Sequence, residues 1–219
     1  MQAREHCSLF DSREISMARD KELHHESIIA AATAEFLEYG FKDASMRRIA
    51  FAAGMSASGL YKHFASKEEM FSALVDPAYQ GLLDIIRQEA DDQEQFIGAR
   101  ELSLWESGRD ASLAVAYIYD HLDAFRLLVC KSQGTKYESI LHDLAVLEEQ
   151  TTLSFMELLK KQGVKLHDFS EKELHLLTTA NVNAVFQTVE HDFTRDEAMH
   201  YADTLDRFFS KGWKEFFGY

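Results

Sequence analysis

The stretch "SMRRIAFAAGMSASGLYKHFASKEEMF", residues 45–71, decides how the N-terminal part of the chain folds. It contains two short helical segments, each preceded by a serine that can cap it, with a glycine between them. Two such helices cross closely when the residues at the crossing are small and the turn tolerates a positive φ. The residues that meet this need are Ala50, Ala53 and Gly54. We therefore predict a helix-turn-helix over about residues 45–64, whose second helix can enter a major groove.

Further helices are expected on both sides of this motif. Apolar residues recur at helical spacing over residues 24–39, and Gly40 supplies a left-handed stop. Ser66 and Glu69 form a capping box that opens a fourth helix. Pro77 then either kinks this helix or restarts it.

The C-terminal part is predicted to be helical as well. A serine or threonine followed three positions later by glutamate recurs there and predicts long helices over roughly 135–162, 170–192 and 194–217. The 219 residues include one proline and ten glycines, so the chain has little of the punctuation that strands and hairpins need. We predict an all-α fold of about nine to ten helices: a three-helix helix-turn-helix head followed by a larger helical body.

Charge is distributed unevenly along the chain. There are 37 acidic and 23 basic residues, and the formal net charge of −14 opposes broad, nonspecific attraction to nucleic acid. Residues 41–67, in contrast, hold five basic side chains and one acidic side chain, whereas residues 76–219 hold 14 basic and 26 acidic ones. Any contact with DNA must therefore be local and must come from the head.

Three stretches, "AAATAEFLEYGF", "SMRRIAFAAGMS" and "GLYKHFASKEEMF", carry a resemblance to a known family. The run that holds them, from Ile28 to about Leu83, resembles the DNA-binding head of TetR-family transcriptional regulators. The resemblance implies a homodimeric repressor that binds a palindromic operator in double-stranded DNA. It also implies that the larger body binds a small-molecule effector, whose identity the sequence does not give.

The resemblance and the charge pattern together suggest three regions. Residues 1–20 are expected to be an N-terminal extension that need not be ordered. Residues 21–75 are expected to be the DNA-binding domain, and residues 76–219 the ligand-binding and dimerisation domain.

Ten residues of the head are predicted to contact DNA. The resemblance assigns backbone phosphate to Tyr61 and Lys67, and it makes Ser45 the cap of a helix whose N-terminus approaches another phosphate. Ser56 and His63 are expected to add phosphate contacts. Arg47 is either a further contact or part of a solvated helix face. Base reading is assigned to four outward-pointing residues: Ala57, Ser58, Gly59 and Lys62.

Two details bear on base reading. Lys62 alone among these four has the reach and the donors for guanine. Many family members carry threonine or alanine where this chain has Gly59, so the glycine removes a side-chain contact and places more weight on Ser58 and Lys62.

Apolar residues of the body admit two interpretations, because aromatic side chains at helical spacing usually form core but can also line a ligand cavity. The candidates for a ligand cavity are Trp105, Tyr117, Phe125 and Phe155. The candidates for a two-fold four-helix dimer interface are Phe155, Leu158, Leu177, Ala180 and Ala184.

Several other classes of protein fit the sequence poorly. We expect no cofactor and no metal site, because the histidines lack ligand spacing, and we expect reduced thiols at Cys7 and Cys130. The absence of a signal core and of a long apolar run predicts a cytoplasmic protein without membrane contact. No phosphate loop or nucleophile with a base suggests an enzyme. The remaining alternatives are a structural DNA-binding protein without effector control and, less favoured, an all-helical enzyme.

Overall fold

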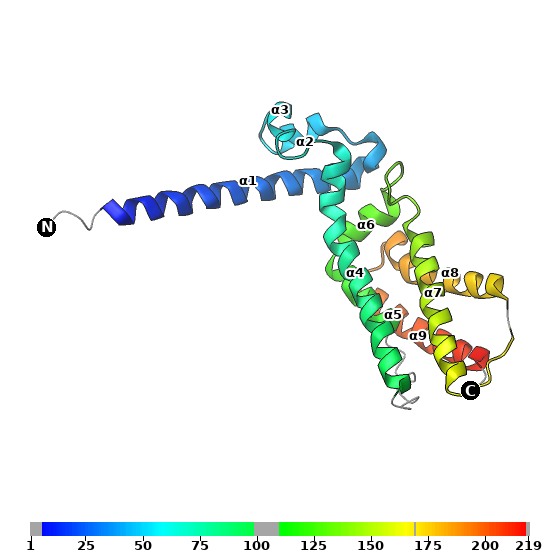
Figure 1. Ribbon diagram of the computed structural model, residues 1–219. Coiled ribbons are helices and arrows are strands. Elements are labelled where there is room, and N and C mark those ends of the chain that lie inside the picture. The colour runs from blue at the N-terminus through cyan, green and yellow to red at the C-terminus, as the bar shows by residue number, and fades with distance from the viewer. Residues whose placement is uncertain (1–5, 99–109, 169, 218–219) are drawn as a thin grey trace. The chain divides into compact units, whose positions relative to one another are not determined.

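The computed structural model describes residues 6–98, 110–168 and 170–217, and these residues form helices and no strand (Figure 1). The all-α prediction is therefore confirmed for the described chain. In chain order the helices are α1 (His6–Asp43), α2 (Met46–Ala52), α3 (Ala57–Leu60), α4 (Lys67–Gly98), α5 (Asp110–Asp120), α6 (Leu122–Cys130), α7 (Ile140–Lys161), α8 (Glu171–Glu190) and α9 (Arg195–Phe217).

The chain divides into two compact units between Leu74 and Val75. Here the head means the unit that ends at Leu74, and the body means the unit that starts at Val75. Helix α4 belongs to both units, since it is continuous from Lys67 to Gly98.

α1 is longer than expected. It begins at His6 and so includes most of the stretch that was expected to be an extension outside any helix. Residues 6–39 contain neither glycine nor proline, so nothing in this stretch breaks a helix. Gly40 ends the regular part of α1 with φ +73, which is the left-handed stop that the sequence predicts.

The core of the head is built around three phenylalanines. Phe36 from α1, Phe41 from the end of α1 and Phe71 from α4 are each at most 5% exposed. Their ring centroids are 5.2 to 6.2 Å apart, and the two pairs that involve Phe71 meet edge to face. These rings join the start of α4 to both sides of the bend at Gly40.

α4 passes through Pro77 instead of restarting there, so one of the two expected outcomes is wrong. Proline removes the amide that would bond the carbonyl of Ala73, four residues earlier. Both Ala73 and Pro77 are exposed, so water can satisfy that carbonyl and the helix can continue.

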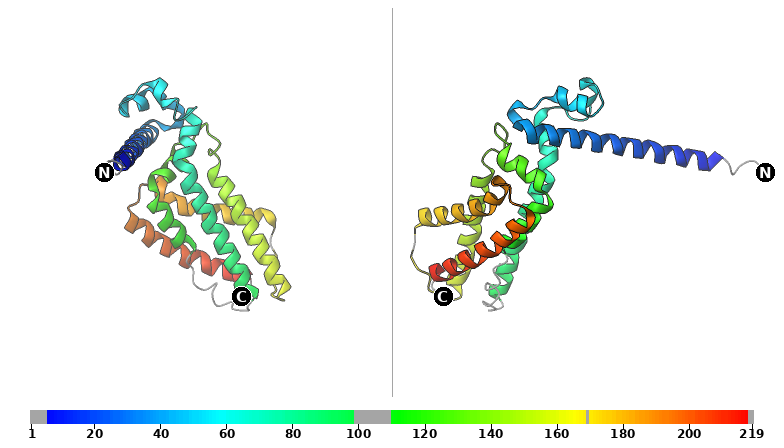
Figure 2. Two further views of the ribbon diagram at one scale, coloured as in Figure 1. Left: turned by 60° about the vertical axis from the view of Figure 1, so that its left-hand side comes forward. Right: turned by 180° about the vertical axis from the view of Figure 1, so that it is seen from behind.

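In the body, α7 packs mainly against α8, and α5 packs mainly against α9 (Figure 2). One buried cluster between α7 and α8 consists of Phe155, Met156, Leu159 and Leu174. No helix within the described ranges combines the length and the apolar character that a membrane crossing requires.

Two of the three capping boxes predicted for the body form. The backbone N–H of Ser170 donates to Glu173 Oε2 over 2.7 Å at the start of α8. The backbone N–H of Thr194 donates to Glu197 Oε2 over 2.8 Å at the start of α9. Both glutamates also accept a hydrogen bond from the side chain of the same capping residue.

The third predicted box is wrong, because α7 begins at Ile140 and not near Thr135. The Glu138 carboxylate accepts a hydrogen bond from the backbone N–H of Gly134 over 2.9 Å, and the Thr135 hydroxyl donates to the carbonyl of Ser132 over 2.7 Å. These groups close a turn before the helix starts.

Candidate nucleic-acid interface

The helix-turn-helix forms where the sequence predicts it. α2 and α3 are joined by a turn in which Gly54 has φ +70, a conformation that side chains with a Cβ rarely adopt. A Cβ added at Gly54 would meet no atom within 4 Å, so the backbone and not the available space requires glycine. Ser56 caps α3, because its Oγ accepts the backbone N–H of Gly59 over 3.0 Å.

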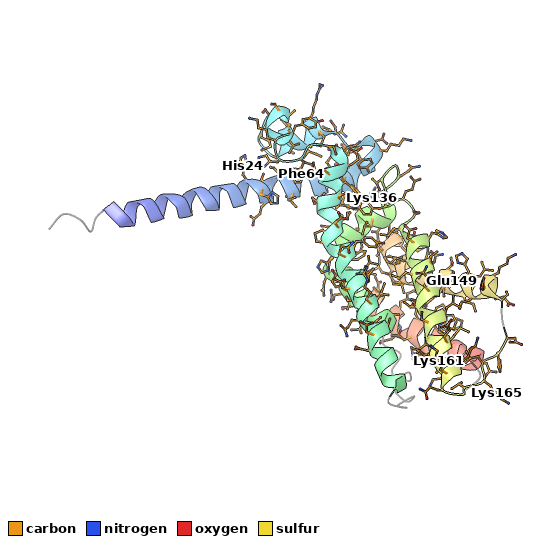
Figure 3. All side chains as sticks on the ribbon, in the orientation of Figure 1. His24, Phe64, Lys136, Glu149, Lys161 and Lys165 are labelled. Atoms are coloured by element: carbon orange, nitrogen blue, oxygen red, sulfur yellow. The ribbon has the colours of Figure 1, made fainter. Side chains whose placement is uncertain are left out.

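Buried side chains hold the two helices against the rest of the head. Ile49 of α2 and Leu60 of α3 are fully buried, and Ala50 at the crossing is 1% exposed. Phe64, which follows α3, is 6% exposed and lies beside α1 near His24 (Figure 3). The ring of His25 stacks on Phe64 with the centroids 6.3 Å apart. These buried contacts hold the inner side of α3 against the rest of the head, and the residues on its outer side remain free to contact a ligand.

The residues predicted to contact DNA differ in exposure. Tyr61 is 51% exposed although it directly follows the fully buried Leu60. The exposed residues among the ten are Arg47, Ser56, Ser58, Tyr61, Lys62 and His63. The half-buried residues are Ser45, Ala57, Gly59 and Lys67.

Ser45 occupies the N-cap position of α2, but its side chain makes no capping hydrogen bond. Its backbone N–H instead donates to Glu35 Oε1 over 2.7 Å. The expectation that the Ser45 hydroxyl caps α2 is therefore wrong in its chemistry. A carboxylate from α1, which the sequence analysis missed, binds at the start of α2.

Glu35 is 8% exposed, and a nearly buried carboxylate needs a charged partner. Arg48 of α2 provides that partner, since its Nε donates to Glu35 Oε1 over 2.7 Å. The Arg48 guanidinium also lies 4.2 Å from the centroid of the Tyr39 ring. The hydrogen bond that Arg48 donates to Glu35 raises the pKa of Arg48 above its ordinary value. Arg48 therefore joins α2 to α1 and is not simply part of a solvated face.

Lys67 has a similar positioning role. Its Nζ donates to the carbonyls of Lys42 and Ala44, each over 3.1 Å, and lies 4.6 Å from the centroid of the Phe41 ring. Two of its three donors thus hold the link between α1 and α2. An ammonium has three donors, so one donor remains for a further acceptor.

The Glu35 network gives a first testable prediction. Glu35→Ala removes the acceptor for Ser45 and the ion-pair partner of Arg48, so the head should lose about 2 kcal/mol of unfolding free energy. Urea titration followed by circular dichroism measures this loss. Glu26→Ala is the matched control, because Glu26 is exposed on the same helix. An equal loss for both variants would contradict a specific role for Glu35.

The four candidates for a ligand cavity do not all come together. Trp105 lies outside the described residues. Tyr117 and Phe125 are neighbours, with ring centroids 6.1 Å apart, whereas Phe155 belongs to the cluster between α7 and α8. The Tyr117 phenol packs so closely on α4 that a Cβ added at Gly81 would lie 1.9 Å from its hydroxyl oxygen. Burial raises the pKa of Tyr117.

The candidates for a dimer interface also separate. Phe155 is 5% exposed, so the chain's own core already uses it and it is not available to a partner. Leu158 packs against that same cluster. Leu177 is 37% exposed, Ala180 is exposed and Ala184 is half-buried, all on α8. The neighbouring Leu176, which the sequence analysis did not select, is 67% exposed.

Acidic and histidine side chains also occur in the body. His175 Nδ1 lies 2.9 Å from Glu149 Oε2 and joins α8 to α7. Within the described ranges no three histidine, cysteine, aspartate or glutamate residues are grouped so that they could hold a metal ion.

The geometry of the head defines a helix-turn-helix DNA-binding domain, and comparison with known proteins agrees with it. The family model for bacterial regulatory proteins of the tetR family matches residues 28–74. Residues 28–74 thus match the DNA-binding domain of the TetR family, in agreement with the resemblance that the sequence carries.

Two curated relatives match part of the chain. The HTH-type transcriptional repressor AcnR of Corynebacterium efficiens is 31% identical over 80 residues, which cover 32% of this chain and 43% of that protein. The HTH-type transcriptional repressor KstR2 of Mycobacterium tuberculosis is 44% identical over 57 residues, which cover 26% of each chain. The chain thus spans less than half the length of these curated relatives.

A solved structure extends the likeness to the body at the level of fold. The TetR family transcriptional regulator PfmR of Thermus thermophilus superposes with a TM-score of 0.57 and 21% sequence identity. The match covers 82% of this chain and 91% of that one. At this identity the match shows a shared fold.

Proposed function

We propose that the protein is a transcriptional regulator, most simply a repressor, that binds double-stranded DNA as a homodimer and responds to a small-molecule effector. The observation that carries the proposal is the exposure of Tyr61, Lys62 and His63 directly after the buried Leu60. This short segment presents a hydroxyl, an ammonium and an imidazole. Groups of all three kinds can bind phosphate oxygens or base edges.

Local charge lets such a site act in an anionic protein. The net charge is −14, so long-range attraction to a phosphate backbone is weak. At close range a few cations suffice, because each phosphate that is neutralised releases counterions. We therefore expect binding to depend on sequence more than binding by a strongly basic protein does, since little nonspecific attraction contributes.

Two heads are needed for this mode of binding. A single α3 is one helical turn long and reads few bases, whereas two copies about 34–36 Å apart can enter successive major grooves of a palindromic site. The exposed face of α8 supports dimerisation. Leu176, Leu177 and Ala180 leave apolar surface in water, and the small alanine lets another helix approach closely.

The body is proposed to hold the effector beside Tyr117 and Phe125. The ring centroids of Phe125 and Phe186 of α8 are 6.2 Å apart, so aromatic side chains from α5, α6 and α8 meet there. An effector that binds one arrangement of the body more tightly than another shifts the balance between a DNA-competent and a DNA-incompetent dimer. Because α4 is shared by head and body, it is the helix through which such a shift passes.

The proposal is tested by selecting duplexes from a randomised DNA library with the full-length protein and measuring affinity by fluorescence anisotropy. A selected palindromic duplex should bind far more tightly than a scrambled duplex of the same composition. Recovery of no preferred duplex would count against the proposed function.

Two variants then separate base reading from phosphate binding. Lys62→Ala should weaken binding to the selected duplex about ten-fold or more and leave binding to the scrambled duplex nearly unchanged, because a lost base contact removes preference. Tyr61→Phe should weaken both by a similar factor of about three to ten, because its hydroxyl is assigned to phosphate. Equal losses on both duplexes for Lys62→Ala would contradict its assignment to a base.

A further inference from the structure

A small cavity in the body lies between α4 and the start of α7. Its volume is about 180 Å³, and it is lined by polar and aromatic side chains that include Asp76 and Tyr79 of α4, and Lys136 and Tyr137 from the turn before α7. None of the residues proposed to bind the effector lines it.

The Asp76 carboxylate, which lines the cavity, contacts two residues of the turn before α7. The Tyr137 hydroxyl donates a hydrogen bond to Asp76 Oδ1, and Tyr137 is 5% exposed. Lys136 lies on the same turn (Figure 3), with its Nζ 3.8 Å from Asp76 Oδ2 and 4.8 Å from the centroid of the Tyr137 ring. The ring of Tyr79 meets that of Tyr137 edge to face at 6.4 Å. One carboxylate of α4 is thus held by two consecutive residues of a turn.

The turn that carries Tyr137 is itself firmly built. The backbone N–H of Tyr137 donates to Thr135 Oγ1 over 3.1 Å, and its carbonyl accepts from the Ser132 hydroxyl over 3.4 Å. Gly134 and Glu138 close the same turn with a hydrogen bond of 2.9 Å. A hydroxyl presented from a braced backbone loses little conformational freedom when it bonds a partner, so the contact to Asp76 is pre-organised.

Asp76 lies at the point of α4 where the helix is least constrained. Asp76 immediately precedes Pro77, where the helix lacks one hydrogen bond and bends most easily. It also lies two residues beyond the point at which head and body divide. The bond from Tyr137 therefore holds α4 at its weakest place.

We propose that the Tyr137–Asp76 hydrogen bond, supported by Lys136, is a latch that couples the turn before α7 to bending of α4 at Pro77. The turn directly follows α6, whose Phe125 packs near Tyr117. A displacement of α6 thus reaches Asp76 through a short, braced segment, and opening the latch frees α4 to bend. The regulatory meaning of the latch rests on the proposed function, whereas its effect on α4 does not.

Hydrogen exchange of the full-length protein tests the latch without DNA. Tyr137→Phe and Asp76→Ala should each speed amide exchange in α4 around residues 73–82 by about ten-fold, and the double variant should exchange no faster than the singles, because the same hydrogen bond is lost in all three. Tyr79→Phe is the matched control: it removes a hydroxyl from the same cavity and should leave exchange in α4 unchanged. Unchanged exchange in Tyr137→Phe would overturn the proposal. So would faster exchange spread equally over α7 and α8, which would indicate a general packing role.

DNA binding provides the second readout. On a duplex selected by the wild-type protein, Tyr137→Phe should change the dissociation constant at least about three-fold and Tyr79→Phe should not. Either an increase or a decrease of the dissociation constant supports the latch. The hydrogen bond stabilises the arrangement of α4 in which it forms, and that arrangement can be the one that binds DNA or the one that does not. Wild-type affinity in Tyr137→Phe despite faster exchange in α4 would overturn the coupling. If the wild-type protein selects no duplex, the proposed function fails, and exchange in α4 alone decides whether the latch exists.

Discussion

Replacing Leu176 and Leu177 together by aspartate is expected to turn the protein into a monomer and to weaken binding to its selected duplex about 100-fold or more. Both leucines are exposed on α8, at 67% and 37%, so charges there cost the isolated chain little. In a dimer interface the two aspartate charges would be buried without a partner of opposite charge, which strongly disfavours association. Loss of the second head then removes the gain in affinity that comes from linking two binding sites.

Light scattering and fluorescence anisotropy measure these two effects. The wild-type protein should have twice the mass of the 25.1 kDa chain, and the double variant should have the single-chain mass. Leu113→Asp is the matched control, because Leu113 is 50% exposed on α5 and is not assigned to the interface. A wild-type monomer, or a double variant that remains dimeric, would contradict the assignment of this face of α8.

Phe36→Ala is expected to unfold the head while the body stays folded. Phe36 is fully buried between Phe41 and Phe71, and truncation of such a side chain typically costs about 3–5 kcal/mol. A unit of this size rarely has more stability than that to lose. DNA binding should disappear.

Limited proteolysis with mass spectrometry follows the two units separately. In Phe36→Ala, cleavage should appear within residues 24–74 while peptides from α5 to α9 stay protected. Phe208→Ala is the matched control: it removes the same group from α9, where the side chain is 71% exposed, and should leave the head intact. Equal cleavage of head and body in Phe36→Ala would show that the two units unfold together.

The head could be predicted from the sequence because its determinants are local. The positive φ at Gly54 and the Ser56 cap act within a few residues, and each leaves a recognisable residue type at a fixed offset. Glu35 was missed for the opposite reason. Its partners, Ser45 and Arg48, are 10 and 13 residues away, and an acidic residue beside Phe36 on a helix ordinarily faces water. Its only sequence signal was a charge next to a strongly apolar position.

The body was less predictable because its contacts are long-range. The same spacing of threonine and glutamate caps a helix at Thr194 and closes a turn at Thr135, and the difference depends on whether a preceding glycine competes for the carboxylate. An apolar residue at helical spacing also does not reveal which partner covers it. Phe155 therefore fitted an interface as well as the core in which it lies.

The construction of α3 also determines how the protein can change its target. Ser58 is exposed and Ala57 is half-buried outside the hydrophobic core, so new side chains at these positions leave the folding of the head almost unaffected. Gly59 is different, because an added Cβ would lie 3.3 Å from the Ser56 hydroxyl that caps the helix. Divergence of DNA preference among descendants of this protein should therefore proceed first through positions 57 and 58, because a side chain at position 59 requires the Ser56 cap to shift.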